Sequence, residues 1–307
     1  MKQILNFIKQ YFKQVDKKVF ILCTTFTSLL IFLNFSQGLE KWLTKGALPF
    51  PDFTGHYLLF LSAFIIPYIF YVITKPNKYF QQPLFLFLLI IAPSIFALKV
   101  SMDTQIHFSD DVLINTYWNR VLYYPLRLII LMSILFLFWL QFDKKESFYG
   151  LNLKNFNWKP YILLLLFMIP LIVAASTQHD FLEVYPKLKT VLPLPETYQS
   201  FSWFYKLLFE ISYGSDFFSI ELFFRGFLIL GFIKWAGKDS ILPMACFYCT
   251  IHFGKPLGEC ISSYFGGILL GIIIYHTKSL FGGLIVHLGI AWLMELGGYV
   301  GNSFFRF

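Results

Sequence analysis

Long apolar runs with few polar positions recur along the whole chain. Each is about as long as a helix that crosses the hydrocarbon core of a bilayer, which takes about 20 residues. None shows the period-two alternation of a membrane β-strand. We therefore predict an all-α, polytopic membrane helical bundle with about eight to nine transmembrane helices. The runs cover residues 19–38, 57–74, 84–100, 121–141, 161–177, 203–233, 241–258, 260–277 and 282–300.

Interruptions of these runs suggest how the chain is organised. Gly254, Pro256 and Gly258 predict a sharp bend between the seventh and eighth runs. Three prolines in 178–202 predict an ordered lid or surface segment. The stretch 148–160, rich in Asn and aromatics, predicts an interfacial segment. It separates N-terminal membrane helices, 1–160, from a second domain, 161–307, which carries the polar motifs described below.

The composition supports a membrane protein, and the distribution of its charges indicates which kind of partner it contacts. The 307 residues are 57% hydrophobic and 14% charged, with a mean hydropathy of +0.63. The net charge of +8 comes from lysines in alternate loops, namely the N-terminal segment, 75–78, 144–159, 234–238 and 278. This predicts cytoplasmic lysine loops with the N-terminus inside and the C-terminus outside. The charge therefore indicates a lipid bilayer and no nucleic acid. We expect the cytoplasmic membrane of a bacterium.

Four polar residues lie inside the apolar runs of the last third: Glu221, Arg225, His252 and His287. A charge at the bilayer centre costs about 2.5–3.5 kcal/mol on insertion scales, so these side chains are expected to face one another or a wet cavity. Glu221 and Arg225 are one helical turn apart and share a face if the helix is regular. They could form a structural ion pair, or Glu221 could be a general base supported by Arg225.

Depth along the helices favours a common site. Counted from the predicted cytoplasmic face at about 1.5 Å per residue, Glu221, His252 and His287 lie roughly 20, 18 and 14 Å deep. Three ionisable groups on three helices therefore reach one layer near the midplane. A transporter with an intramembrane acid is disfavoured, because the chain has no internal repeat.

The cysteines give two further expectations. Cys23, Cys246, Cys249 and Cys260 all fall in apolar segments, so no disulfide framework is predicted. Cys246, Cys249 and His252 also read as C-x2-C-x2-H, which is typical of a zinc half-site that Glu221 or His287 could complete. Positions i, i+3 and i+6 fan out by about 120° on a straight helix, which disfavours this site.

At these polar positions the chain resembles the CAAX prenyl endopeptidase and bacteriocin-processing (CPBP, or Abi) family of intramembrane proteases. The resemblance covers about residues 200–300. The family pattern is Glu-Glu-x-x-x-Arg, Phe-x-x-x-His and His-x-x-x-Asn on successive membrane helices. Here it reads Ile220-Glu221-x-x-x-Arg225, Tyr248-x-x-x-His252 and His287-x-x-x-Ala291. Ile220 and Ala291 thus stand where the family has a glutamate and an asparagine.

In that family the first glutamate, at the position of Ile220 here, is thought to activate water. The resemblance implies an intramembrane endopeptidase if Glu221 has become the water-activating base in its place. His252 and His287 would hold the nucleophile and the oxyanion, and Arg225 would keep Glu221 ionised. Tyr248 and Glu259 would lie close to the substrate, a membrane-embedded or membrane-associated protein or peptide. Lys255 would either reach the membrane interface or bind an anionic end of that substrate. The alternative is a catalytically inactive scaffold or immunity protein. The family has been described both as glutamate-dependent and as metalloprotease, which leaves Zn²⁺ on Glu221, His252 and His287 open.

Overall fold

The protein is built almost entirely from helices. The computed structural model describes residues 2–46, 49–103, 105–153 and 156–305, which contain no strand. Of the residues that the structure describes, 83% are helical. This confirms the all-α prediction, and it is what lipid requires, because a helix satisfies its own backbone hydrogen bonds.

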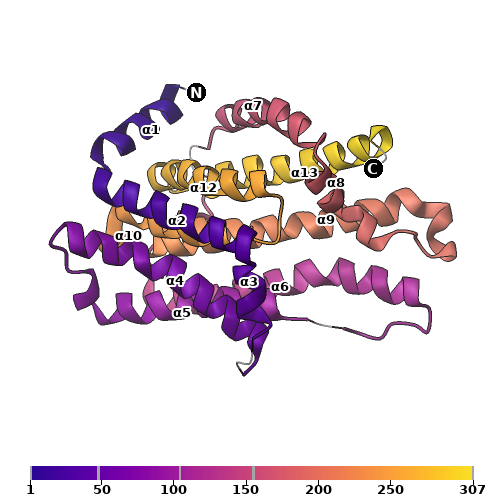
Figure 1. Cartoon of the computed structure of the whole chain (residues 1–307), viewed down its shortest axis with the longest axis horizontal. Helices are drawn as coiled ribbons and strands as arrows, with labels where there is room; N and C mark the ends of the chain where they lie inside the picture. Colours follow the sequence, from indigo (N-terminus) through magenta and orange to yellow (C-terminus); the bar gives the residue numbers. More distant parts are fainter. Residues whose placement is uncertain (1, 47–48, 104, 154–155, 306–307) are drawn as a thin grey trace. The chain divides into compact units, whose positions relative to one another are not determined.

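The helices follow one another with short connections (Figure 1). In chain order they are α1 Lys2–Gln14, α2 Lys17–Gln37, α3 Leu39–Thr44, α4 Pro51–Thr74, η1 Tyr79–Gln81, α5 Pro83–Ser101, α6 Val112–Phe142, η2 Phe148–Gly150, α7 Lys159–Ala175, α8 His179–Val184, η3 Lys187–Val191, η4 Glu196–Phe201, α9 Ser202–Glu221, η5 Leu222–Gly231, α10 Ile233–Ala236, η6 Gly237–Ser240, α11 Ile241–Thr250, α12 Leu257–Thr277 and α13 Phe281–Phe304. Among the η segments, η5 is a π-helix and the others are 3₁₀ helices.

Six described helices are long and apolar enough to cross a membrane: α2, α4, α5, α6, α12 and α13. A seventh is α7 if it is counted with 179–191, from which it is bent by 100°. The predicted eight to nine is therefore approximate. The run at 241–258 supplies only α11, whose ten residues rise about 15 Å. The chain then turns before α12, as Gly254 and Pro256 predicted.

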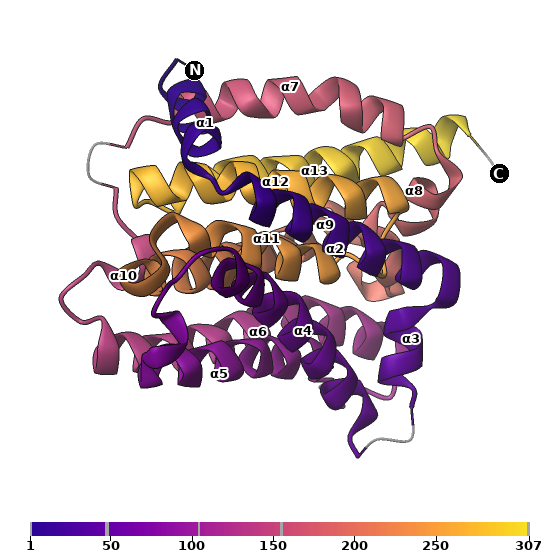
Figure 2. The same ribbon diagram turned by 60° about the vertical axis from the view of Figure 1, so that its left-hand side comes forward.

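The chain folds into two compact units that interleave along the sequence. The first unit comprises residues 1–101, 134–156 and 222–281, and the second comprises 102–133, 157–221 and 282–307. The predicted division at residue 160 cuts the sequence once, whereas each compact unit combines several stretches of sequence. The predicted division is therefore not tested and stays a prediction. In the first unit, α4 packs against α5 and α11 (Figure 2).

Lysine-bearing loops that were predicted to share one membrane face lie together in the first unit. Three contacts join them: Lys75 Nζ to Asp16 Oδ2 at 3.0 Å, Lys234 Nζ to Asp143 Oδ1 at 2.7 Å, and the Tyr79 hydroxyl donating to Asp239 Oδ2 at 2.7 Å. Lys75 lowers the pKa of the Asp16 carboxyl, which also caps α2. Lys154, in the same predicted set, lies outside the described residues. These contacts join the loops to one another, and the membrane face on which they lie stays a prediction.

In the second unit, glycines of α13 allow close packing. A Cβ on Gly298 would lie 2.6 Å from backbone atoms of Tyr185 and Pro186. Three residues earlier, the Glu295 carboxylate accepts hydrogen bonds from the backbone N–H groups of Lys187 and Leu188, at 2.7 and 3.2 Å. The segment 178–202 is therefore ordered, as predicted, and α13 holds it in place.

We expect Gly298→Ala to destabilise the protein and Gly297→Ala to leave it unchanged or more stable. Both changes gain about 0.8–1 kcal/mol of helix propensity. The new methyl group at residue 298 meets backbone, and overpacking costs about 1–3 kcal/mol. At residue 297 it meets side-chain atoms at an ordinary 3.4 Å. Thermal unfolding of the detergent-solubilised variants measures the difference, and equal midpoints would contradict the close approach.

Candidate functional site

Glu221 and His287 meet in the second unit. Glu221 is the last residue of α9, and His287 lies in the second turn of α13. His287 Nδ1 is 2.9 Å from Glu221 Oε1, which is a hydrogen bond and, when the imidazole is protonated, an ion pair. The Glu221 side chain is 1% exposed and that of His287 is 12% exposed. The two residues therefore form a buried carboxylate–imidazole pair, which we call the Glu221–His287 dyad.

Phe217 supports this dyad from one helical turn earlier on α9. Its ring packs edge-on against the His287 ring, with centroids 4.9 Å apart. Phe217 also belongs to an apolar cluster that includes Val191, Leu194 and Ala291. Sequence reasoning missed Phe217, although its position four residues before Glu221 on a helix was the signal that could have found it.

Both positions that depart from the family pattern are buried. Ala291 is 2% exposed within that apolar cluster, and Ile220 is 9% exposed. At Ala291, apolar packing thus occupies the space where the family pattern places an amide. Neither residue adds a polar side chain to the dyad.

The helix changes geometry directly after Glu221. Residues 222–231 form the π-helix η5, so the regular α-helix assumed for the Glu221–Arg225 spacing ends at Glu221. Single π-turns are frequent at functional sites. At Gly226 an added Cβ would lie 2.8 Å from the Tyr149 carbonyl oxygen, so this glycine lets η2 pack closely on η5. Residues 148–150 of the predicted interfacial segment therefore pack against the π-helix.

Arg225, Tyr248 and His252 form a second cluster, in the first unit. The fully buried Arg225 guanidinium lies 4.0 Å from the centre of the Tyr248 ring, a cation–π contact. The His252 ring packs on the same tyrosine, and its Nδ1 is 3.0 Å from the Tyr248 carbonyl oxygen. Because a carbonyl oxygen only accepts, Nδ1 carries the proton. This cluster belongs to the first unit and the Glu221–His287 dyad to the second. That the two converge on one site stays a prediction.

Lys255 and Glu259 pair with each other across the start of α12. Lys255 Nζ lies 2.6 Å from Glu259 Oε1, and the side chains are 27% and 14% exposed. This contact is a local i,i+4 ion pair. Roles of these residues towards a substrate stay predictions.

The residues of the predicted zinc half-site point to different neighbours. Cys246 Sγ lies 3.2 Å from the Thr27 hydroxyl, Cys249 contacts Cys260, and His252 binds a backbone carbonyl. Among the described residues no group of three or more His, Cys, Asp or Glu side chains could hold a metal ion. The described donors thus do not fit Zn²⁺, and we derive no step through a metal. Metal dependence itself stays a prediction.

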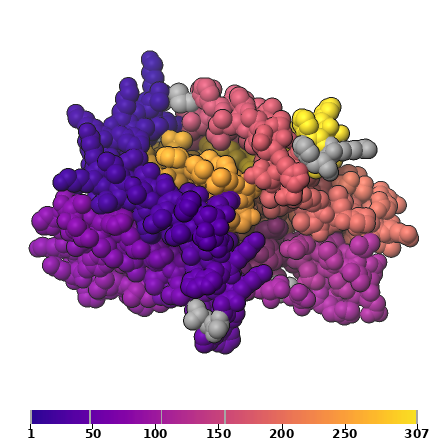
Figure 3. Space-filling view, in the orientation of Figure 1, coloured from indigo at the N-terminus to yellow at the C-terminus, as the bar shows by residue number. Residues whose placement is uncertain are grey.

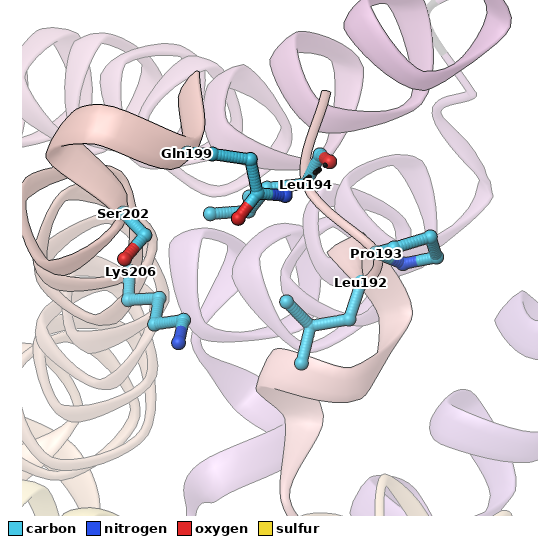
Figure 4. Close-up of a pocket in the computed structure, with 6 residues that line it drawn as sticks. All are labelled: Leu192, Pro193, Leu194, Gln199, Ser202 and Lys206. Carbon is cyan, nitrogen blue, oxygen red and sulfur yellow. Dashed lines mark hydrogen bonds between the residues drawn. The ribbon is translucent and has the colours of Figure 1, made fainter. Parts of the chain in front are cut away.

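A surface pocket of about 530 Å³ also lies in the second unit, between the 192–199 segment and the start of α9 (Figure 4). Its lining residues are Leu192, Pro193, Leu194, Gln199, Ser202 and Lys206. Lys206 is fifteen residues before Glu221 on α9, which corresponds to about 22 Å. The pocket is therefore separate from the dyad.

Comparison with known proteins finds one family model that matches the part of the chain with these buried polar side chains. Residues 205–293 match the family model for Rce1-like, type II CAAX prenyl endopeptidases. No curated protein and no solved structure matches the chain. The matched segment contains both clusters of buried polar side chains. Residues 205–293 of this multi-pass membrane protein are therefore similar to the Rce1-like, type II CAAX prenyl endopeptidases, and the match supports the CPBP/CAAX protease family.

Proposed function

We propose that the protein is an intramembrane peptidase that hydrolyses a peptide bond of a membrane-embedded or membrane-associated protein or peptide. The observation that carries this proposal is the hydrogen bond between Glu221 and His287 in a buried setting. The family match supports the same class of reaction. We place the protein in the cytoplasmic membrane of a bacterium.

The dyad supplies the base. With its Nδ1–H donating to the Glu221 carboxylate, His287 has its basic lone pair on Nε2. The dyad takes a proton from water, and the resulting hydroxide attacks the carbonyl carbon of the scissile bond. Glu221 stabilises the imidazolium that forms. The same proton then passes to the leaving amine as the C–N bond breaks. Such general base help is worth about 10²–10⁴-fold in rate.

His252 serves a second, orienting role. Its Nδ1–H is committed to the Tyr248 carbonyl, so the neutral ring accepts hydrogen bonds at Nε2. In that form it orients water, and it donates to an oxyanion only when protonated. An oxyanion donor is worth about 10²–10³-fold. Arg225 stays the candidate that keeps Glu221 ionised.

A catalytically inactive scaffold or immunity protein is the second candidate. The observation that favours it is the apolar packing around Ala291, which leaves that position without the amide of the family pattern. In this case the dyad is a structural hydrogen bond that holds α9 to α13. Loss of this hydrogen bond would lower the stability of the protein and would not alter the cleavage of any peptide.

We expect new peptide termini in membranes of cells that express the wild-type protein and none in cells that express Glu221→Gln. The amide keeps the size of the side chain and removes the carboxylate charge. Quantitative mass spectrometry of protein termini makes the comparison. Glu183→Gln is the matched control, because Glu183 forms an exposed pair with His179 at 3.5 Å and should behave as wild type. Identical peptide termini in cells that express the wild type, Glu221→Gln and Glu183→Gln would show that the protein is catalytically inactive.

On any product found this way, Glu221→Gln and His287→Ala should each lower cleavage about 10²–10⁴-fold, and the double variant should lose no more than either. Residues that act as one unit are non-additive in this manner. Rates of product formation in reconstituted vesicles, with folding checked by thermal unfolding, give the numbers. Full activity of His287→Ala, or multiplicative losses in the double variant, would contradict a shared proton.

A further inference from the structure

Two thiols lie side by side where α11 ends and α12 begins. Cys249 is the residue before the last of α11, and Cys260 lies in the first turn of α12. Their sulfur atoms are 3.9 Å apart, and Cys249 Sγ lies 3.4 Å from the Cys260 carbonyl oxygen. Both side chains are fully buried in the first unit. The sequence predicted no disulfide framework, and the described cysteines are free thiols.

The sulfurs are within reach of a covalent bond. A disulfide holds its sulfurs about 2.05 Å apart, so each would move by about 1 Å. The intervening chain includes the break at 251–256, which carries His252 and Lys255. A bond between these two cysteines would tie both ends of that break together.

The break lies far from the lysine-bearing loops. The Asn34 side chain donates a hydrogen bond of 3.2 Å to the Phe253 carbonyl oxygen. Asn34 is seventeen residues along α2 from Lys17, which corresponds to about 26 Å. The thiol pair is therefore displaced towards the face opposite the predicted cytoplasmic loops. In many cells that face borders a compartment where disulfides persist.

A groove lies beside the part of α12 that carries Cys260, although neither buried thiol lines it. The groove, of about 570 Å³, runs between α2 and α12 and is mainly apolar. Its lining includes Leu257, Ile261 and Tyr264, which flank Cys260 on α12. Figure 3 shows the α12 region, in orange, exposed beside α2, in indigo.

We propose that Cys249 and Cys260 are a redox pair that a membrane-soluble two-electron oxidant of the quinone class converts to a disulfide. Each thiol loses one hydrogen, the sulfur–sulfur bond forms, and the quinone takes both hydrogens to become a quinol. The disulfide then fixes the 251–256 break and with it the backbone that carries His252. This proposal is independent of the peptidase activity.

Diamide, a disulfide-forming oxidant, tests the pairing in nanodisc-embedded protein. After oxidation, free thiols are blocked with N-ethylmaleimide in denaturant, and a protease that cleaves after glutamate separates the two cysteines at Glu259. We expect a linked Cys249–Cys260 peptide pair, lighter by two hydrogens and reversed by dithiothreitol. Cys23→Ser should retain this linkage, whereas Cys260→Ser should lose it. Alkylated Cys249 and Cys260 after oxidation, or a Cys23–Cys246 linkage in their place, would overturn the assignment.

Amide hydrogen exchange tests the consequence for the break. In the oxidised wild-type protein, amides of residues 251–258 should exchange about tenfold more slowly than in the reduced protein, because local opening is restricted. Amides of α4, which lie outside the closed loop, should not change and serve as the internal control. Unchanged exchange at 251–258 in a sample shown to be linked would overturn the locking role.

Discussion

A carboxylate that is removed from water must find a partner, and Glu221 finds His287. This hydrogen bond joins the end of α9 to the second turn of α13, so the polar centre of the second unit depends on it. The surrounding packing holds the two helices in register. Phe217 fixes the imidazole from the α9 side, and close packing at Gly298 and Glu295 anchors the other half of α13 to the 178–202 segment.

Departures from regular helix occur beside the polar residues. The α-helix gives way to a π-helix at residue 222, directly after Glu221. In the same way, α11 ends at Thr250, two residues before His252. Each departure leaves the neighbouring side chain at the boundary of an element. A side chain at such a boundary is less constrained than one inside a regular helix. Such irregular backbone is frequent at functional sites and is supported here by tight packing, as of η2 on Gly226.

Much of the helical fold could be predicted, because apolar runs report burial in lipid directly. Gly254 and Pro256 likewise predicted the break before α12. The depth arithmetic predicted that Glu221 and His287 share a layer, and the two side chains are hydrogen-bonded. The π-helix had no comparable signal, since no proline or glycine lies at its start. The anchoring of 178–202 by Glu295 depends on tertiary contacts, which residue spacing does not encode.

The most direct test of the account is the state of the His287 imidazole. Nitrogen-15 NMR of histidine-labelled protein in nanodiscs resolves which ring nitrogen carries the proton and how strongly it is hydrogen-bonded. The account predicts a strongly deshielded Nδ1–H signal, assigned by its loss in His287→Ala, that also disappears in Glu221→Gln. A signal that persists unchanged in Glu221→Gln would show that the carboxylate does not hold the ring, and would contradict the dyad.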